Sequence, residues 1–134
     1  MKVRANRAKT LPLTNRGDLS LFPVGCGSAF SKTLYQNNFL IVKGDDHCMI
    51  DCGTRTPEAL AGLGRPVTDI ENWLITHSHA DHVGGLEEVM LMGRYVARQK
   101  PNIVITAEYE RILSTSEIYA LSQSIALHDG AGLG

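Results

Sequence analysis

Three histidines and an aspartate lie within six consecutive positions of the sequence, in the segment "LITHSHADHVGGL" of residues 74–86. His77 and His79 are two positions apart in a nearly extended segment, so their side chains can project to the same side. Neutral imidazole nitrogens are good ligands for zinc and similar first-row ions. Asp81 and His82 follow where the backbone turns, and they would reach a point beside the first ion. The spacing therefore predicts a metal centre, which we prefer to the alternative of surface histidines near the start of a helix.

The segments on either side of the histidines predict where this centre lies. The run "NWLIT" has the character of a short strand, and Gly84 and Gly85 lead into a helical stretch. The motif is therefore expected at the carboxyl end of a strand, where layered α/β folds often gather their ligands. Small residues at positions 78 and 80 leave the surroundings open, and the two glycines let the backbone pass close to the site.

The remaining sequence predicts a layered domain of strands and helices. Residues 18–24 are expected to form a short strand that ends in a glycine turn, and residues 38–43 to pair with "HCMID" in a β-hairpin. A helix is expected to begin with Thr56 as its cap and Pro57 as its first residue. "NIVIT" predicts another strand, and residues 108–124 predict another helix. This alternation of strands and helices is typical of an α/β or α+β layered fold.

The helical stretch that follows the histidine motif is predicted to bury one face. Apolar side chains recur there at spacings of three and four until Pro101 ends the helix. The side chains on this face are Leu86, Val89, Met90, Val96 and Ala97.

The segment "THSHADHVGG" resembles the H-x-H-x-D-H signature of the metallo-β-lactamase superfamily of metal-dependent hydrolases. Upstream, "NFLIVKGDDHCMIDCGT" is similar to the paired strands of that family, which end in an aspartate-x-glycine turn, here Asp51, Cys52 and Gly53. "VTDIENWLITH" is similar to the family's lead-in to the motif, so the resemblance covers residues 18–106. It implies an αββα sandwich with one or two metal ions, usually zinc, at the edge of the sheet.

The resemblance also implies roles for the residues of the motif. His77 and His79 would bind the first ion and Asp81 and His82 the second, with Asp81 also taken as the catalytic residue. The expected cofactor is one or two Zn²⁺ ions, with Mn²⁺ or iron as alternatives. Hydroxide held at the metal would attack an ester, thioester, amide or phosphodiester, because metal binding lowers the pKa of water to about 7. Asp51 would either orient the motif loop or cap its own turn, and the sequence leaves both roles open.

A glycine-rich segment favours phosphodiesters as the substrate class. "VGCGSAF", followed by Gln36, Asn37 and Asn38, is similar to the "G-x-G-S-A" loop and the following asparagine of the ribonuclease Z-like branch. Those enzymes and related phosphodiesterases, including ones acting on cyclic nucleotides, cleave phosphodiesters, so the expected partner is a small-molecule or nucleotide substrate. The glycine turn would present backbone N–H groups to a phosphate, or it is a tight exit from the strand. Ser78 and Ala80 depart from the motif of that branch, so thioester, lactone or β-lactam hydrolysis stays an alternative.

The chain lacks the downstream ligands that the resemblance implies. Members of the family consist of two similar halves, and the second half supplies a further histidine, a bridging aspartate and a final histidine. After His82 this sequence has one histidine, His128, which is an alternative third ligand of the first ion. We therefore expect the N-terminal half of the sandwich, either as a hydrolase or as an incomplete fragment that binds metal or associates with itself. Such a half would expose an apolar sheet face, so a homo-oligomer is expected in which two copies cover each other.

Composition and charge argue against several other classes of function. The 134 residues carry a net charge of −1, which gives no general attraction to nucleic acid or membranes. No apolar run approaches the ~20 residues of a membrane span or resembles the ~7–15-residue core of a signal peptide. Three cysteines are too few for a disulfide framework, so a cytoplasmic location is expected. The basic residues before Asp18 predict an arm over residues 1–17, solvated or in contact with phosphates, ahead of a domain over residues 18–134.

Overall fold

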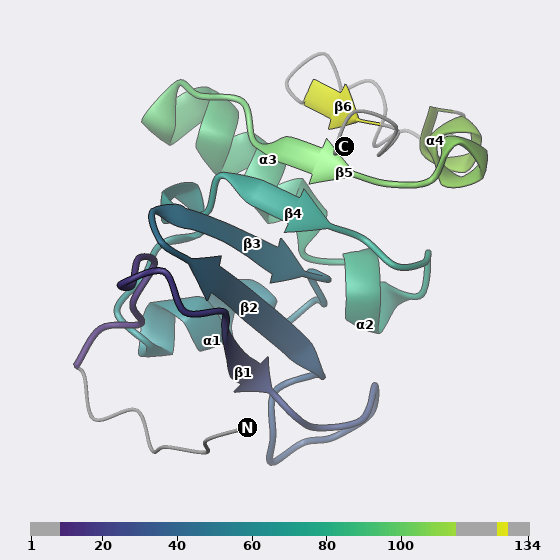
Figure 1. Ribbon diagram of the computed structural model, residues 1–134. Coiled ribbons are helices and arrows are strands. Elements are labelled where there is room, and N and C mark those ends of the chain that lie inside the picture. Colours follow the sequence, from purple (N-terminus) through teal and green to yellow (C-terminus); the bar gives the residue numbers. More distant parts are fainter. Residues whose placement is uncertain (1–8, 115–125, 129–134) are drawn as a thin grey trace.

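The computed structural model describes residues 9–114 and 126–128 of the chain. These residues build a six-stranded sheet whose strands lie side by side in the order in which they occur along the chain (Figure 1). The strands are β1 (Ser20–Gly25), β2 (Asn38–Lys43), β3 (Asp46–Ile50), β4 (Asn72–Leu74), β5 (Asn102–Val104) and β6 (Ala126–His128). The pairs β1–β2 and β2–β3 are antiparallel, whereas β3–β4, β4–β5 and β5–β6 are parallel. The predicted hairpin is the β2–β3 pair.

Helices make the crossovers that parallel strands require. They are α1 (Thr56–Gly62), α2 (Ala80–Val83), α3 (Leu86–Met92) and α4 (Ala107–Ser114), with a 3-10 helix η1 (Val67–Asp69) and a π-helix η2 (Gly93–Ala97). α1 and η1 connect β3 to β4, and α2, α3 and η2 connect β4 to β5. α1 and α3 lie behind the sheet in the view of Figure 1. A mixed sheet with helices packed on it confirms the predicted layered α/β (α+β) fold.

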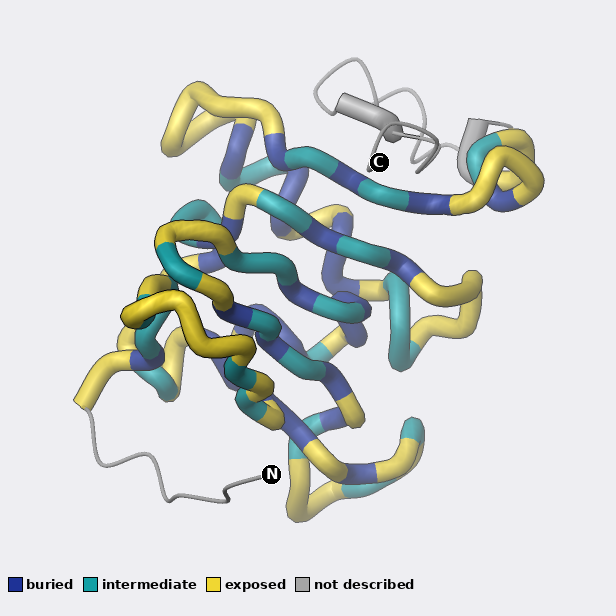
Figure 2. Tube along the Cα trace, in the orientation of Figure 1, coloured by how far each residue is buried: buried dark blue, intermediate teal, exposed yellow. Residues whose placement is uncertain are grey.

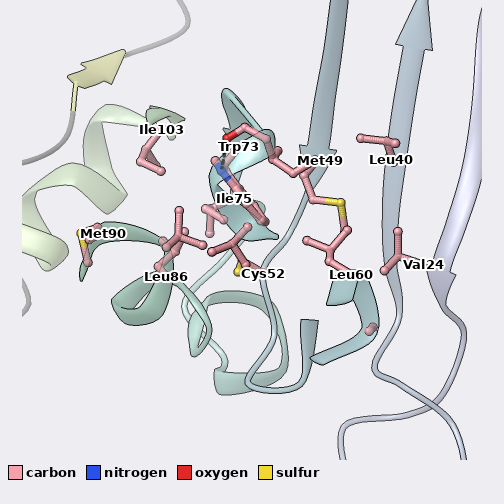
Figure 3. Packing of buried hydrophobic residues seen from close by; sticks show 14 of the residues in the cluster. Val24, Leu40, Met49, Cys52, Leu60, Trp73, Ile75, Leu86, Met90 and Ile103 are labelled. Atoms are coloured by element: carbon pink, nitrogen blue, oxygen red, sulfur yellow. Dashed lines mark hydrogen bonds between the residues drawn. The ribbon is translucent and has the colours of Figure 1, made fainter. Parts of the chain in front are cut away.

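The face of the sheet that α1 and α3 cover holds the hydrophobic core. Leu40, Met49, Trp73 and Ile103 are register partners on four neighbouring strands, and all four are 0% exposed. Figure 3 shows the helix side chains that pack with them, which include Leu60, Leu86 and Met90. Burying a side chain of this size contributes about 1.5–3 kcal/mol. This row therefore holds β3 and β4 side by side, and the predicted metal-binding residues follow the second of these strands.

The opposite face of the sheet is apolar as well, but it is only partly covered. Buried and partly exposed positions alternate along β2 and β4, as Figure 2 shows. By register, the outer side chains form two rows that run across the strands. One row is Leu21, Ile41 and Cys48, which the polar pair Asn72 and Asn102 continues on β4 and β5, and the other is Phe39, Ile50, Leu74 and Val104. We call the seven apolar residues of these rows the open face, and its presence agrees with the apolar sheet face expected of half a sandwich.

The start of α1 differs from the prediction at Thr56. We expected this threonine to cap the helix, but it is the first helical residue, and Arg55 precedes it as a cap without a side-chain hydrogen bond. The physical reason is a tertiary contact, because the Thr56 hydroxyl donates to Oδ1 of Asn38 at 2.8 Å. Pro57 still lies in the first turn, where its missing N–H costs nothing.

The helical stretch after the motif also differs from the prediction. It is divided into α3 and the π-helix η2, and Val96, which we expected on the buried face, is 64% exposed. The prediction was wrong because the wider turn of a π-helix shifts the buried face away from the three-four spacing. Arg98 then reverses the chain with a left-handed φ of 55°. Of the helix predicted over residues 108–124, α4 is described, and residues 115–124 lie outside the described part.

The segment before β1 packs against the domain from residue 9 onward. Leu11 is 2% exposed, its N–H donates to the carbonyl of Leu63 (2.9 Å), and its own carbonyl accepts from Nε of Arg65 (2.8 Å). Residues 1–8 and the tail of residues 129–134 lie outside the described part, so the arm over residues 1–17 stays a prediction. Within the described ranges, no helix has the length and apolar character needed to cross a membrane.

Candidate metal centre

The predicted metal-binding residues follow the carboxyl end of β4, beside the turn that follows the neighbouring parallel strand β3. β3 ends at Ile50 and leads into a turn of residues 51–53, and β4 ends at Leu74 and leads into the motif of residues 77–82. Ile50 and Leu74 are register partners, so the turn and the motif leave the sheet side by side. In Figure 1, α2 lies beyond the end of β4. The structure thus places the motif at the sheet edge, as the sequence predicted.

His77 and His79 form a pair at the exposed side of this edge. Nε2 of His77 lies 3.2 Å from Nδ1 of His79, and the centroids of the two rings are 4.8 Å apart. Two nitrogens that bind one tetrahedral zinc at about 2.0–2.1 Å are themselves roughly 3.3 Å apart. The observed separation therefore fits joint binding of one ion as well as it fits a hydrogen bond. Both side chains are exposed, so solvent and substrate can reach them.

His82 lies between two carboxylates. Its Nδ1 is 2.7 Å from Oδ2 of Asp51, which is 4% exposed, and its Nε2 is 3.2 Å from Oδ2 of Asp81. A carboxylate on one ring nitrogen fixes the imidazole tautomer and its orientation. With Nδ1 facing Asp51, the second ring nitrogen, Nε2, faces Asp81. The nitrogen and the oxygen of this second pair have the spacing of two ligands that share an ion.

The donor atoms are of the right type for zinc, but they are too few for a complete site. Among the residues that the structure describes, no three histidine, cysteine, aspartate or glutamate side chains are placed so that they could hold one ion. A catalytic zinc usually has three protein ligands. The His77–His79 pair and the Asp81–His82 pair therefore fit two partial sites. The backbone of His128 lies at the same sheet edge, since Leu74 pairs with Val104 and Val104 with His128. The alternative of His128 as a third ligand stays a prediction.

Asp51 holds the turn and the motif together. Its Oδ1 accepts from the backbone N–H of Thr76 (2.8 Å), and the Thr76 hydroxyl lies 2.9 Å from each carboxylate oxygen. Cys52 N donates to the carbonyl of His82 (2.7 Å), and Gly85 N donates to the carbonyl of Cys52 (2.8 Å). Asp51 itself has a left-handed φ of 63°. Of the two roles left open by the sequence, these contacts support an aspartate that orients the motif loop.

Gly53 is required where the turn meets the motif. A Cβ atom on Gly53 would lie 2.3 Å from the carbonyl oxygen of Asp81 and 2.4 Å from Oε1 of Gln36. Real Cβ atoms do not approach other atoms so closely, so any side chain here would push these segments apart. The aspartate-x-glycine pattern thus has a packing reason in this chain.

The glycine turn after β1 has a packing reason too. A Cβ on Gly25 would lie 2.0 Å from the carbonyl oxygen of Gln36, and one on Gly27 would lie 2.9 Å from the carbonyl oxygen of Tyr35. The N–H of Gly27 donates to that Tyr35 carbonyl (2.7 Å). The sequence left two interpretations of this turn open, a phosphate-binding turn and a tight exit from the strand. Close packing explains both glycines, and the N–H of Gly27 already donates to the Tyr35 carbonyl, so these contacts support the tight exit.

Sequence reasoning did not single out three residues that support the centre. Thr76 binds Asp51, and Gln36 and Asn38 bind the residues that follow the aspartate-x-glycine turn. Gln36 and Asn38 were noted for their likeness to a family loop, but no role followed from it. The only signal for Thr76 was its place directly before the first histidine.

Cys52, in the middle of the turn, is enclosed by protein. It is 0% exposed, and burial raises the pKa of its thiol far above the ordinary value, helped by the carboxylates of Glu88 and Asp51. A protonated buried thiol is a poor nucleophile and a poor metal ligand. Cys52 therefore acts as a small core residue beneath the site.

Solved structures that superpose on the chain define its class. A diphosphatase of the PhnP family has a TM-score of 0.64 at 18% identity and covers 81% of this chain, which matches 48% of the diphosphatase. Human tRNase Z, short form, gives a TM-score of 0.59 at 22% identity, over 81% of this chain and 42% of that one. The Bacillus subtilis metallo-β-lactamase fold protein YhfI gives 0.57 at 21% identity, over 72% of this chain and 42% of that one. The chain thus has the metallo-β-lactamase fold. It spans slightly less than half of the length of each of these solved chains.

The family is narrower than the fold. The model of the family Anti-Pycsar protein Apyc1 matches residues 19–126, and the chain belongs to this family. The Anti-Pycsar protein Apyc1 of Bacillus phage 010DV004 is 40% identical over 105 residues, which are 73% of this chain and 41% of the phage protein. That of Paenibacillus xerothermodurans is 48% identical over 77 residues, which are 58% of this chain and 31% of that protein. The matched part is therefore well under half of these curated relatives.

Proposed function

We propose that this chain contributes the metal-binding edge of a metal-dependent hydrolase that cleaves phosphodiester bonds. The observation that carries the proposal is the two ligand pairs, each with donor atoms 3.2 Å apart, that follow the carboxyl end of β4. The fold supports hydrolysis as the class of reaction, because its solved neighbours are named as a diphosphatase and a tRNase. Both names concern bonds to phosphate, which supports phosphodiesters over thioesters, lactones or β-lactams.

Each residue of the pairs has a proposed part in this chemistry. His77 and His79 would hold one ion and His82 with Asp81 a second, with zinc as the expected metal and Mn²⁺ or iron as alternatives. The bound metal supplies a Lewis acid and lowers the pKa of its water to about 7. Asp51 keeps the proton of His82 on Nδ1, so that Nε2 faces the site. Asp81 is the one acidic residue of the two pairs, and its side chain is 23% exposed, so solvent reaches its carboxylate. It is therefore the proposed catalytic residue.

The name of the relatives suggests where this hydrolysis is used. They are called Anti-Pycsar proteins, and we propose that the chain takes part in the same action through its matched residues. Cyclic nucleotides then join linear phosphodiesters as candidate substrates. The rest of the ligand set would come from outside the described residues, since those residues supply two ligands to each ion.

Elemental analysis of the purified protein, combined with hydrolysis assays, tests the proposal. We expect bound zinc that is lost in His77→Ala and His79→Ala, and retained in His47→Ala, whose ring accepts from the N–H of Glu71 away from the site. A chromogenic phosphodiester, a cyclic nucleotide and a thioester would be compared as substrates. Protein without metal after reconstitution with zinc would refute the metal centre. Turnover of the thioester alone would refute the substrate class.

A second candidate function is that of a self-associating module, and the open face favours it. Seven apolar side chains line this face, and six of them are partly exposed while Leu21 is 58% exposed. Apolar patches of this kind on soluble proteins mark contact surfaces. We propose a second copy of the chain as the occupant, because it presents the same seven apolar residues. A pair related by a two-fold axis would cover both open faces at once.

Light scattering over a range of protein concentrations tests this second candidate. We expect a dimer that is lost in Ile41→Lys, because Ile41 lies in the middle strand of its row of the open face. Val96→Lys is the matched control, since it puts the same charge on an apolar side chain that is 64% exposed on η2 instead. A wild-type protein that stays monomeric at high concentration, or a dimer that survives Ile41→Lys, would count against the proposed surface.

A further inference from the structure

We propose that Gln36 and Asn38 are positioning residues of the candidate metal centre, an inference that rests on the function proposed above. Both side chains are buried, at 7% and 1% exposure. They lie just before and at the start of β2, where they bind the turn of residues 53–56. We call the two amide side chains together with this turn the amide clamp. The motif packs against the same turn, since the carbonyl oxygen of Asp81 lies against Gly53.

Asn38 provides the first half of the amide clamp through its oxygen. Its Oδ1 accepts from the N–H of Gly53 (2.9 Å) and from the hydroxyl of Thr56 (2.8 Å). Its Nδ2 is buried and has no hydrogen-bond partner among the described residues. The contacts of Asn38 therefore run through its acceptor oxygen, which fixes the turn directly after Asp51.

Gln36 provides the second half and links the turn to a third segment. Its Oε1 accepts from the N–H of Arg55 (3.1 Å), and the hydroxyl of Thr54 lies 3.0 Å from its Nε2. Nε2 also faces the carbonyl of Ala29 at 3.5 Å. The one side chain thus holds the turn to the loop that connects β1 with β2. Both backbone N–H groups that the amide clamp binds lie at the amino end of α1.

The amide clamp is coupled to the metal-binding pairs in two ways. A Cβ on Gly53 would meet both the carbonyl oxygen of Asp81 (2.3 Å) and Oε1 of Gln36 (2.4 Å), so the motif and the amide clamp close on the same position. Asp51, two residues before Gly53, holds a left-handed φ of 63° and binds His82. A non-glycine residue in that conformation persists only where its surroundings over-determine it. The amide clamp fixes the chain on one side of Asp51, and β3 fixes it on the other.

A positioning role differs measurably from a merely structural one. If the two amides served only to stabilise the fold, their loss would weaken every part of the domain together. If they position the motif, their loss would first release the contacts between the turn and the motif. Those contacts include two backbone N–H groups, Thr76 to Asp51 and Cys52 to His82, which amide hydrogen exchange reports one by one.

The experiment is amide hydrogen exchange on metal-free protein, so that it works whether or not the chain binds zinc. Gln36→Leu removes the acceptor for Arg55 N–H, and Gln36→Glu retains it. Asn15→Ala is the matched control. Asn15 is also a partly buried amide with several backbone partners, among them Val42 and Gly44 at the far end of β2.

We expect Gln36→Leu to speed exchange at Thr76 and Cys52 by about tenfold while the Trp73 amide of β4 keeps its rate. Gln36→Glu keeps the acceptor but loses the Nε2 donor, so it should speed exchange at Thr76 and Cys52 less than Gln36→Leu does, and Asn15→Ala should leave these rates unchanged. Equal acceleration at all three amides in Gln36→Leu, or no acceleration at Thr76, would overturn the positioning role. Zinc content, measured separately on the wild type, tests the proposed function. Absence of zinc there would refute that function and leave the exchange result as it stands.

Discussion

Substitutions of Asp51 separate the two contributions that this residue makes to stability. Its carboxylate is 4% exposed and binds the N–H and hydroxyl of Thr76 and the ring of His82. Hydrogen bonds to a charged group contribute about 1.5–3 kcal/mol each, and they are not additive when they share an acceptor. We therefore expect Asp51→Ala, which loses these hydrogen bonds, to lower the free energy of unfolding by about 2–4 kcal/mol.

Asp51→Gly removes the same side-chain contacts but suits the backbone better. The φ of 63° costs an ordinary residue such as alanine about 1–2 kcal/mol, and glycine adopts it freely. Asp51→Gly should therefore be about 1 kcal/mol more stable than Asp51→Ala. The assay is urea unfolding followed by the fluorescence of Trp73, the single tryptophan, which is 0% exposed. Equal stability of the two variants would refute the strain, and a loss below about 1 kcal/mol in both would refute the importance of the contacts.

Asp51→Asn probes the orientation of His82 instead of stability alone. Asparagine tolerates left-handed φ values and keeps an oxygen for the Thr76 N–H. Its amino group would face Nδ1 of His82, where the carboxylate now lies at 2.7 Å. The ring would then carry its proton on Nε2, the nitrogen proposed to bind metal. We expect nitrogen NMR of the imidazole to show this exchange of tautomers, and zinc content to fall. An unchanged tautomer would contradict the proposed function of Asp51.

Three further outcomes follow from burial and close packing. Burial raises the pKa of the Cys52 thiol in the folded chain, so the unfolded chain loses this proton first once the pH exceeds about 8.5. The free energy of unfolding should then fall by about 1.4 kcal/mol per pH unit, and Cys52→Ala should lack that part of the slope in urea titrations at several pH values. In the folded protein, iodoacetamide should alkylate the exposed Cys26 and spare the buried Cys52, as measured by mass spectrometry of peptides. Alkylation of Cys52 ahead of Cys26 would contradict its burial. Gly53→Ala should cost more than Gly44→Ala by thermal melting, because Gly44 has a φ of 63° but open space around it, whereas a Cβ on Gly53 meets two segments.

The parts of the fold that were predictable are those encoded by neighbouring residues. β2 shows alternating buried and partly exposed positions in a short apolar run, and the turn signal Gly44-Asp45-Asp46 follows it, so the hairpin follows from local sequence. The motif of His77 to His82 could be singled out for the same reason, because its residues are contiguous in the chain, and its metal binding stays a prediction. Ligand types and spacing within one turn need no knowledge of the tertiary structure.

The parts that were missed depend on contacts between distant residues. Thr56 has the composition of a helix cap, but its hydroxyl is taken by Asn38, eighteen residues earlier. Val96 continues the helical spacing of α3, but the π-helix turns it outward. Asp51 and His82 are 31 residues apart and meet only because β3 and β4 are neighbours. A sequence without its register cannot show such pairs.

The position of β1 at one end of the sheet limits how copies of this chain can grow into larger assemblies. A strand at a sheet edge normally offers a ladder of free N–H and C=O groups to another strand. Pro23 takes a donor out of β1, and the register shift between Pro23 and Gly25 interrupts the ladder further. Continuous edge-to-edge assembly would require β1 of one molecule to pair with β6 of the next molecule. Because the β1 edge is blunted, edge-to-edge addition stops after one step, which protects the chain against fibre formation while its open face stays available.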